Sequence, residues 1–236
     1  TNISLKSLLN NEFLIEQIEI STNSIEIDNL ISFTKSIYQI PELIILEKLF
    51  RIKGYLIADI KLEFDESGNL RDNYTANGFV KETKLKTLKD NNVDKINFFF
   101  RISKEDFIFE NIKLRFKNYT LNSEIISVKK NKGDFIVNGN FKNDIIELNE
   151  KDLELLKEAF FSNIDFTKVK FTSKNDFSFK VDKKFKFKDK KLISKIQLHE
   201  AKILNNLNLN GIFPDIKKEI RLLNNEINLD YRKNFF

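Results

Sequence analysis

The stretch GYLIADIKLEFDESGNLRDNYTANGFV, residues 54–80, decides the fold of this chain. Apolar residues hold every even position from Leu56 to Phe64, and charged residues hold most of the odd ones. This two-residue period is typical of a strand with one face in water. Five turn-forming residues, 65–69, follow, and a second apolar row begins at Tyr74. The stretch therefore predicts a long antiparallel hairpin in a mainly β chain.

Towards the N-terminus, the pattern predicts two strands followed by two short helices. Residues 2–9 and 13–22 carry the alternation of a strand pair. Asp28 precedes apolar residues at helical spacing, so we expect it to cap a short helix. Pro41 suits the first turn of a second helix, over residues 41–50.

Beyond the hairpin, the alternation returns in two further pairs of strands. Strands are predicted over residues 95–102 and 107–116, and a change in the parity of the apolar positions predicts a bulge near Asn111. Residues 121–128 and 134–141 form a second predicted hairpin, because a glycine-containing turn separates them.

One amphipathic helix interrupts the strands. Asn149 is a good N-cap, and apolar residues at helical spacing predict a helix over residues 150–162. Short strands are then predicted over residues 168–172, 176–181, 184–188, 192–198 and 203–209. Residues 215–223 are predicted to form a short helical turn or an edge, and residues 226–231 a last strand.

These elements predict a mainly β fold, an elongated and curled antiparallel sheet that resembles a groove, with a few short helices. The four expected parts are a strand pair with two helices, a groove segment, the amphipathic helix and a continuing β segment, over residues 1–50, 51–145, 146–164 and 165–236. Two arrangements stay open, a closed sandwich and an uncovered trough. Roughly a dozen strands about 4.8 Å apart would make a trough of about 55 Å. Its apolar face would need an apolar ligand or a neighbouring protein.

The composition excludes several classes of protein. The chain has 236 residues, of which 41% are hydrophobic and 32% charged, so it is neither disordered nor embedded in a membrane. It has no cysteine for disulfides or thiolate chemistry. It begins with Thr1 and contains no methionine, so we expect a segment of a larger protein. The net charge of +5 reflects lysines that alternate with apolar residues, as on any solvated strand face.

No motif predicts catalysis or a cofactor. His199 is the only histidine, and the polar face of a strand explains it better than a metal site does. The 24 phenylalanines could stack on bases if they lay on the wet face, but Phe98, Phe100, Phe107 and Phe109 fall on the apolar one. We therefore expect no enzymatic activity, no metal, no cofactor and no nucleic-acid partner.

Several stretches together resemble the AsmA-like family of bacterial envelope proteins. They are ISLKSLLNNEFLIEQIEISTNSIEIDNLISFTKSI, PELIILEKLFRIKGYLIADIKLEFDESGNLRDNYTANGFVKETKLK, FENIKLRFKN, GDFIVNGNFKN and FSFKVDKKFKF. The resemblance spans nearly the whole sequence and consists of pattern more than of invariant motifs. It implies a periplasmic protein, held in the bacterial inner membrane by an N-terminal helix outside this sequence. Such proteins form long β-grooves that are thought to carry phospholipid between the inner and outer membranes.

The expected ligand is phospholipid or another molecule with acyl chains, and the envelope proteins that would flank the groove are unknown. From their parity, the residues expected to line the groove are Leu56, Ile60, Leu62, Phe64, Phe98, Phe100 and Phe109. We expect Phe100→Asp to abolish lipid binding without unfolding the sheet. The alternative function is that of a closed β-sandwich, a structural or interaction domain of an envelope protein without lipid cargo.

Overall fold

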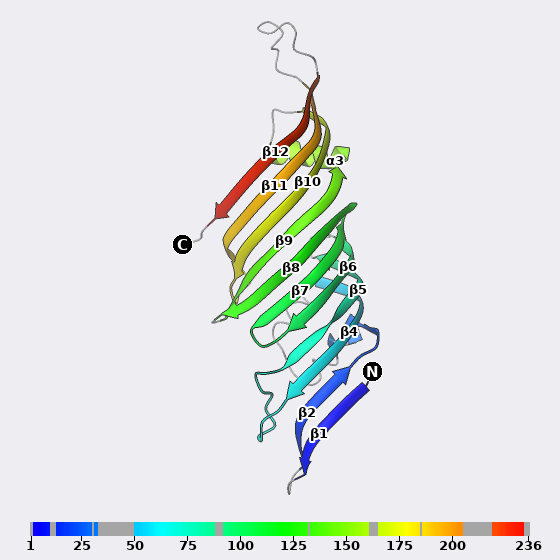
Figure 1. Ribbon diagram of the computed structural model, residues 1–236, viewed down its shortest axis with the longest axis vertical. Coiled ribbons are helices and arrows are strands. Elements are labelled where there is room, and N and C mark those ends of the chain that lie inside the picture. Colours follow the sequence, from blue (N-terminus) through cyan, green and yellow to red (C-terminus); the bar gives the residue numbers. More distant parts are fainter. Residues whose placement is uncertain are drawn as a thin grey trace.

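In the computed structural model, most of the described residues belong to a single antiparallel β-sheet (Figure 1). The structure describes residues 2–9, 13–29, 31–32, 50–87, 92–131, 133–160, 165–184, 186–204 and 219–233. Strands make up 79% of the described residues, and the sheet has twelve strands and is not closed. The predicted fold class is confirmed, and the described strands do not form a closed sandwich.

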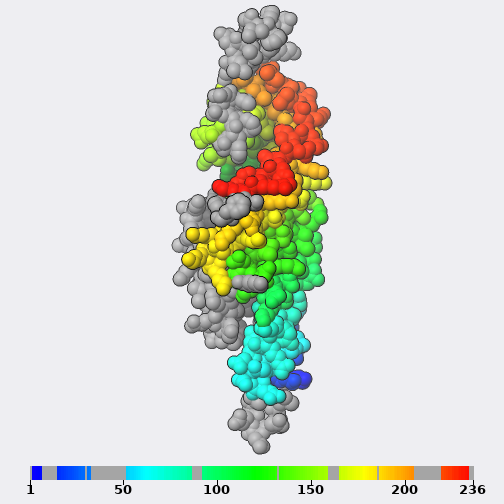
Figure 2. Space-filling model, turned by 90° about the vertical axis from the view of Figure 1, so that its left-hand side faces the viewer, coloured from blue at the N-terminus to red at the C-terminus, as the bar shows by residue number. Residues whose placement is uncertain are grey.

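The strands follow one another across the sheet in the order of the sequence, β1-β2-β4-β5-β6-β7-β8-β9-β10-β11-β12, with β3 paired beside β2 on β4. The first six are β1 (Asn2–Leu9), β2 (Phe13–Ser21), β3 (Ile25–Glu26), β4 (Phe50–Glu63), β5 (Thr75–Thr87) and β6 (Asn92–Ile102). The others are β7 (Asp106–Phe116), β8 (Tyr119–Asn131), β9 (Asp134–Glu147), β10 (Asp165–Val181), β11 (Phe187–Leu204) and β12 (Glu219–Lys233). Because neighbours in sequence are neighbours in space, the molecule is elongated, with its blue and cyan strands towards one end and its orange strands towards the other (Figure 2). This one sheet runs through the predicted segment boundaries.

The hairpins form where the sequence predicts them. In the turn between β4 and β5, Asp65 Oδ1 accepts the backbone N–H of Ser67 at 2.9 Å and that of Asn69 at 2.8 Å. Gly133, between β8 and β9, has a φ of +93° that few other residues adopt. Asn111, at a φ of 52°, marks the predicted bulge, where the pairing of β6 and β7 shifts register.

Helix α3 (Glu150–Phe160) confirms the predicted amphipathic helix and its cap. The backbone N–H of Asp152 donates to Asn149 Oδ1 at 3.0 Å, which satisfies one of the free donors at the helix start. The helix lies behind β10 and β11 in Figure 1. Residues 27–29 and 31–32 are also helical, so Asp28 already lies inside the first turn instead of capping it. The second predicted helix, over residues 41–50, lies outside the described residues except for Phe50, which begins β4.

The C-terminal strands are longer than predicted. The sequence indicates a break at residues 173–175, but β10 runs through it because Ser173 and Asn175 find hydrogen-bond partners inside the sheet. Likewise β11 replaces three short predicted strands, since a bulge at Asp189, with a φ of 48°, keeps the polar run 188–191 in the sheet. Residues 205–209, which end the last of these predicted strands, lie outside the described residues.

The described part of the predicted helical turn or edge, from residue 219 onwards, is strand, and it belongs to β12.

Close cross-strand packing on one face depends on two glycines. A Cβ on Gly78 would lie 2.6 Å from Phe100 Cζ, and one on Gly139 would lie 2.7 Å from Phe177 Cζ. In both places, a phenylalanine of the next strand lies over the bare backbone of a glycine, an arrangement that stabilises glycine within a sheet.

Candidate functional site

One face of the sheet carries rows of apolar side chains that cross most of its strands, and we call it the apolar face. A first row of directly paired residues crosses nine strands, from β1 to β10: Ile3, Ile20, Ile60, Ala76, Ile102, Phe107, Val128, Val137 and Phe179. A second row crosses from β4 to β12: Ala58, Gly78, Phe100, Phe109, Ile126, Gly139, Phe177, Leu192 and Tyr231. Neither row contains a charged residue, so a continuous apolar surface connects the two ends of the sheet.

Helical segments cover two parts of this face. The helical residues 27–29 and 31–32 are called the first helical segment here. Its Ile27 and Ile31 pack with Leu56, Val80 and Phe100 of β4–β6.

At the other end, Leu153 of α3 packs with Val169 of β10 and with Leu198 and Ala201 of β11. Among the described residues, no element packs on the middle of the face, where Phe107, Val128 and Val137 are half-buried. The middle strands are therefore the part of the apolar face that no described element covers.

Aromatic rings follow one another across the face. Phe98 meets Phe109 edge-on, with ring centroids 5.6 Å apart. Phe177 stacks on Phe141 at 5.6 Å and on Phe179 at 6.0 Å. These contacts place neighbouring aromatic rings next to one another on the apolar face, in the edge-on and stacked arrangements that aromatic pairs prefer.

The seven predicted lining residues share the apolar face but differ in exposure. Leu56 and Phe100, with 6% and 8% of their surfaces exposed, belong to the cluster beneath the first helical segment. Ile60, Phe98 and Phe109 pack against that cluster. Leu62 pairs with Ile18 of β2, and Phe64 forms a bridge with Leu70 beyond the end of β4. Their role as a lining remains a prediction.

This placement changes the expectation for Phe100→Asp. A carboxylate there would be buried among Leu56, Val80 and Ile27 without a partner, which is strongly unfavourable. We now expect this substitution to destabilise the fold. Half-buried positions in the middle, such as Val137, test the groove better.

The choice of residues from sequence missed the middle of the face, namely Ile126, Val128, Val137 and Phe177. Their alternation was visible in the sequence. The alternation does not show which part of the face the helices cover. The position of the helices decides which of these residues are exposed.

A small polar cluster interrupts the apolar face beside α3. Asn143 and Ser173 face each other on β9 and β10, and the Ser173 backbone N–H donates to Asn143 Oδ1 at 3.1 Å. Asn175 Nδ2 donates to Ser173 Oγ at 2.8 Å and to the Phe141 carbonyl at 3.1 Å. The cluster carries no charge and satisfies its own hydrogen bonds, so it does not select a charged ligand.

A polar network holds the start of α3 against β8. Asp152 accepts hydrogen bonds from Lys117 Nζ at 2.6 Å and from the Tyr119 hydroxyl. Burial opposes the ionisation of Asp152, but the hydrogen bonds from Lys117 and Tyr119 outweigh it and lower the pKa of the carboxyl. Burial and the neighbouring Asp152 raise the pKa of Tyr119 to about 12. The network therefore fixes α3 over one end of the apolar face.

Within the described ranges, no group of three or more His, Cys, Asp or Glu side chains gathers where it could hold a metal ion. Thr172 Oγ1 lies 3.2 Å from His199 Nε2, on the polar side of β10 and β11. Across the same described ranges, none of the helices is both long and apolar enough to span a membrane.

Comparisons with protein families, curated proteins and solved structures find no match for this chain.

Proposed function

We propose that this protein carries phospholipid along its apolar face, as a segment of a periplasmic AsmA-like protein anchored in the bacterial inner membrane. The observation that supports the proposal is the pair of uncharged rows that cross the sheet, whose middle no described element covers. An apolar surface of this extent in water favours the binding of a ligand with hydrocarbon chains.

The dimensions of the sheet suit more than one lipid. The path of eleven strands contains ten steps of about 4.8 Å, which makes the face roughly 48 Å long. One acyl chain spans a single leaflet of a bilayer, which is about half of a hydrocarbon core that is roughly 30 Å thick. Several acyl chains therefore fit one after another along the face.

The chemistry of the face suits movement better than fixed binding. Hydrocarbon contacts are non-directional, and the hydrogen bonds of the polar cluster around Asn143 and Ser173 are already made within the protein. A lipid would therefore meet no deep specific site that would hold it. Its headgroup would remain in water at the margin of the sheet.

A pair of neighbouring substitutions on β9 tests the proposal. Val137 lies on the apolar face, and Asn138 is exposed on the opposite face. Val137→Asp should abolish transfer of a fluorescent phospholipid from donor to acceptor vesicles, whereas Asn138→Asp should leave it intact. Both variants introduce the same charge into the same strand, so a general electrostatic effect would appear in both.

Circular dichroism must show that each variant keeps its β content. A folded Val137→Asp protein that transfers lipid as fast as the wild type would refute the proposal. So would a wild-type protein that transfers none.

A further inference from the structure

The opposite, polar face carries an apolar patch that the groove does not explain. The patch consists of four residues on β4, β5 and β6: Tyr55, Ile57, Phe79 and Phe99. Ile57, Phe79 and Phe99 are directly paired across the three strands, and the two phenylalanine rings lie 4.7 Å apart. Tyr55, Ile57 and Phe99 are 48%, 48% and 50% exposed. We call these four residues the outer patch.

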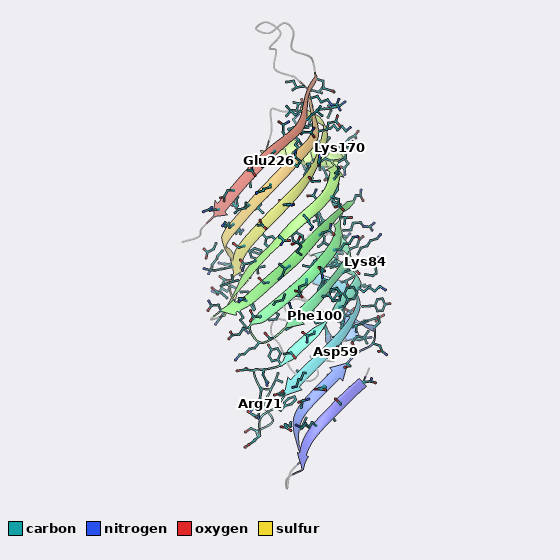
Figure 3. The ribbon with its side chains drawn as sticks, in the orientation of Figure 1. Asp59, Arg71, Lys84, Phe100, Lys170 and Glu226 are labelled. Atoms are coloured by element: carbon teal, nitrogen blue, oxygen red, sulfur yellow. The ribbon has the colours of Figure 1, made fainter. Side chains whose placement is uncertain are left out.

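A group of lysines lies beside the outer patch on the same face: Lys53, Lys81, Lys84 and Lys113. Lys53 and Lys84 are directly opposite each other on β4 and β5, and like charges in that position repel. No described carboxylate forms a salt bridge with any of the four. Figure 3 shows Lys84 at the margin of the sheet. We call these residues the lysine cluster.

Nearby acidic groups neutralise the lysine cluster only in part. Asp94 is held by Arg115 at 2.6 Å and Glu110 by Arg101 at 2.9 Å. Glu82 is an exposed acid among the lysines.

Asp59, which is labelled in Figure 3, follows Ile57 by two positions on the same face of β4 and so borders the outer patch. Glu26, exposed on β3, lies directly opposite Tyr55. Balanced against Glu82, Asp59 and Glu26, the four lysines leave a net charge of +1 beside exposed aromatic rings.

The combination fits a lipid surface better than a protein partner. Three half-exposed side chains of this size offer about 300 Å² of surface, because an aromatic side chain buries roughly 150–250 Å² in full. A stable protein interface needs about 800 Å² from each partner. A membrane surface needs only a few interfacial aromatic or aliphatic side chains together with basic residues that meet lipid phosphates.

We infer that the outer face of β4–β7 docks on the surface of an anionic phospholipid bilayer. Phe99, Ile57 and Tyr55 enter the interface, while the lysine cluster pairs with phosphate groups. Docking uses the face opposite the groove, so it does not depend on the proposed transport of lipid.

Sedimentation with vesicles tests the inference. The purified chain is mixed with vesicles of phosphatidylcholine alone, or of phosphatidylcholine and phosphatidylglycerol in equal parts. We expect binding to the anionic vesicles that weakens with added salt, and little binding to the neutral ones. Since each lysine near an anionic surface contributes about a factor of five in affinity, Lys53→Gln with Lys84→Gln should weaken binding by at least about tenfold. Phe99→Ser should weaken it as well.

Two controls separate the outer face from other causes. Lys174 and Lys195 are exposed lysines directly opposite each other on β10 and β11, on the same polar face. Replacing both with glutamine removes the same charge and should leave binding unchanged. Val137→Asp should lose lipid transfer and still dock, so that failure of docking and failure of transport are distinguishable.

Three outcomes would overturn the inference. One is equal binding to neutral and anionic vesicles. A second is an equal loss of binding in the Lys53/Lys84 and Lys174/Lys195 double variants. The third is a dimer in solution that Phe99→Ser dissociates, which would assign the outer patch to a second copy of this chain.

Discussion

Replacing Gly78 with alanine should destabilise the sheet, although alanine usually stabilises a strand relative to glycine by roughly 0.5–1 kcal/mol. A Cβ at this position would lie 2.2 Å from the backbone oxygen of Ile57 and 2.6 Å from Phe100 Cζ. The oxygen belongs to the paired strand and cannot rotate away, so β4 and β5 must separate locally. Phe100, which is 8% exposed beneath the first helical segment, must move with them. Overpacking of this kind costs about 1–3 kcal/mol.

Gly139→Ala is the matched control. There, the close contacts are with side chains alone, Phe177 Cζ at 2.7 Å and Ile126 Cγ1 at 2.9 Å, and both residues are half-buried. These side chains can turn aside, so the loss should be smaller. Urea unfolding followed by circular dichroism gives the free energy of unfolding of each variant. A Gly78→Ala protein as stable as the wild type, or no less stable than Gly139→Ala, would refute the reasoning.

Three further predictions concern the polar groups. Asn149→Ala should lower the free energy of unfolding by about 1 kcal/mol through loss of the α3 cap, and an unchanged urea midpoint would contradict this. Because the pKa of Tyr119 is raised to about 12 from 10.0, its contribution to stability is complete below pH 10 and lost towards pH 12. Urea unfolding across that range should show a steeper decline for the wild type than for Tyr119→Phe, and parallel declines would count against it. Hydrogen bonds from the backbone of Lys186 and from Lys188 lower the pKa of Asp182 to about 2 from 3.8, so its contribution is complete above pH 3.8 and lost towards pH 2. NMR titration of the carboxyl should show this value, and titration near 3.8 would disprove it.

Local patterns predict much of this fold because neighbouring strands in the sheet are also neighbours in sequence. The alternation in β4, the turn at Asp65 and the cap at Asn149 each depend on a few adjacent residues. The lengths of β10 and β11 could not be predicted in this way. Ser173 is a turn-forming residue in sequence, and only its pairing with Asn143, thirty positions away, makes it part of a strand.

The candidate site, too, was predictable from the sequence only in part. Parity alone places Leu56, Phe98 and Phe100 on one face, as the structure does. Their burial depends on where the first helical segment packs, which is a tertiary property. The outer patch also escaped prediction, since Ile57, Phe79 and Phe99 come together only through cross-strand register.

Native mass spectrometry of the protein purified from a bacterial envelope tests the central claim most directly. The proposed transport of lipid predicts a folded monomer that carries more than one phospholipid, because the apolar face is longer than a single acyl chain needs. Val137→Asp should lose these adducts and Asn138→Asp should keep them. A folded, monodisperse protein without bound lipid would contradict the claim that the apolar face carries phospholipid.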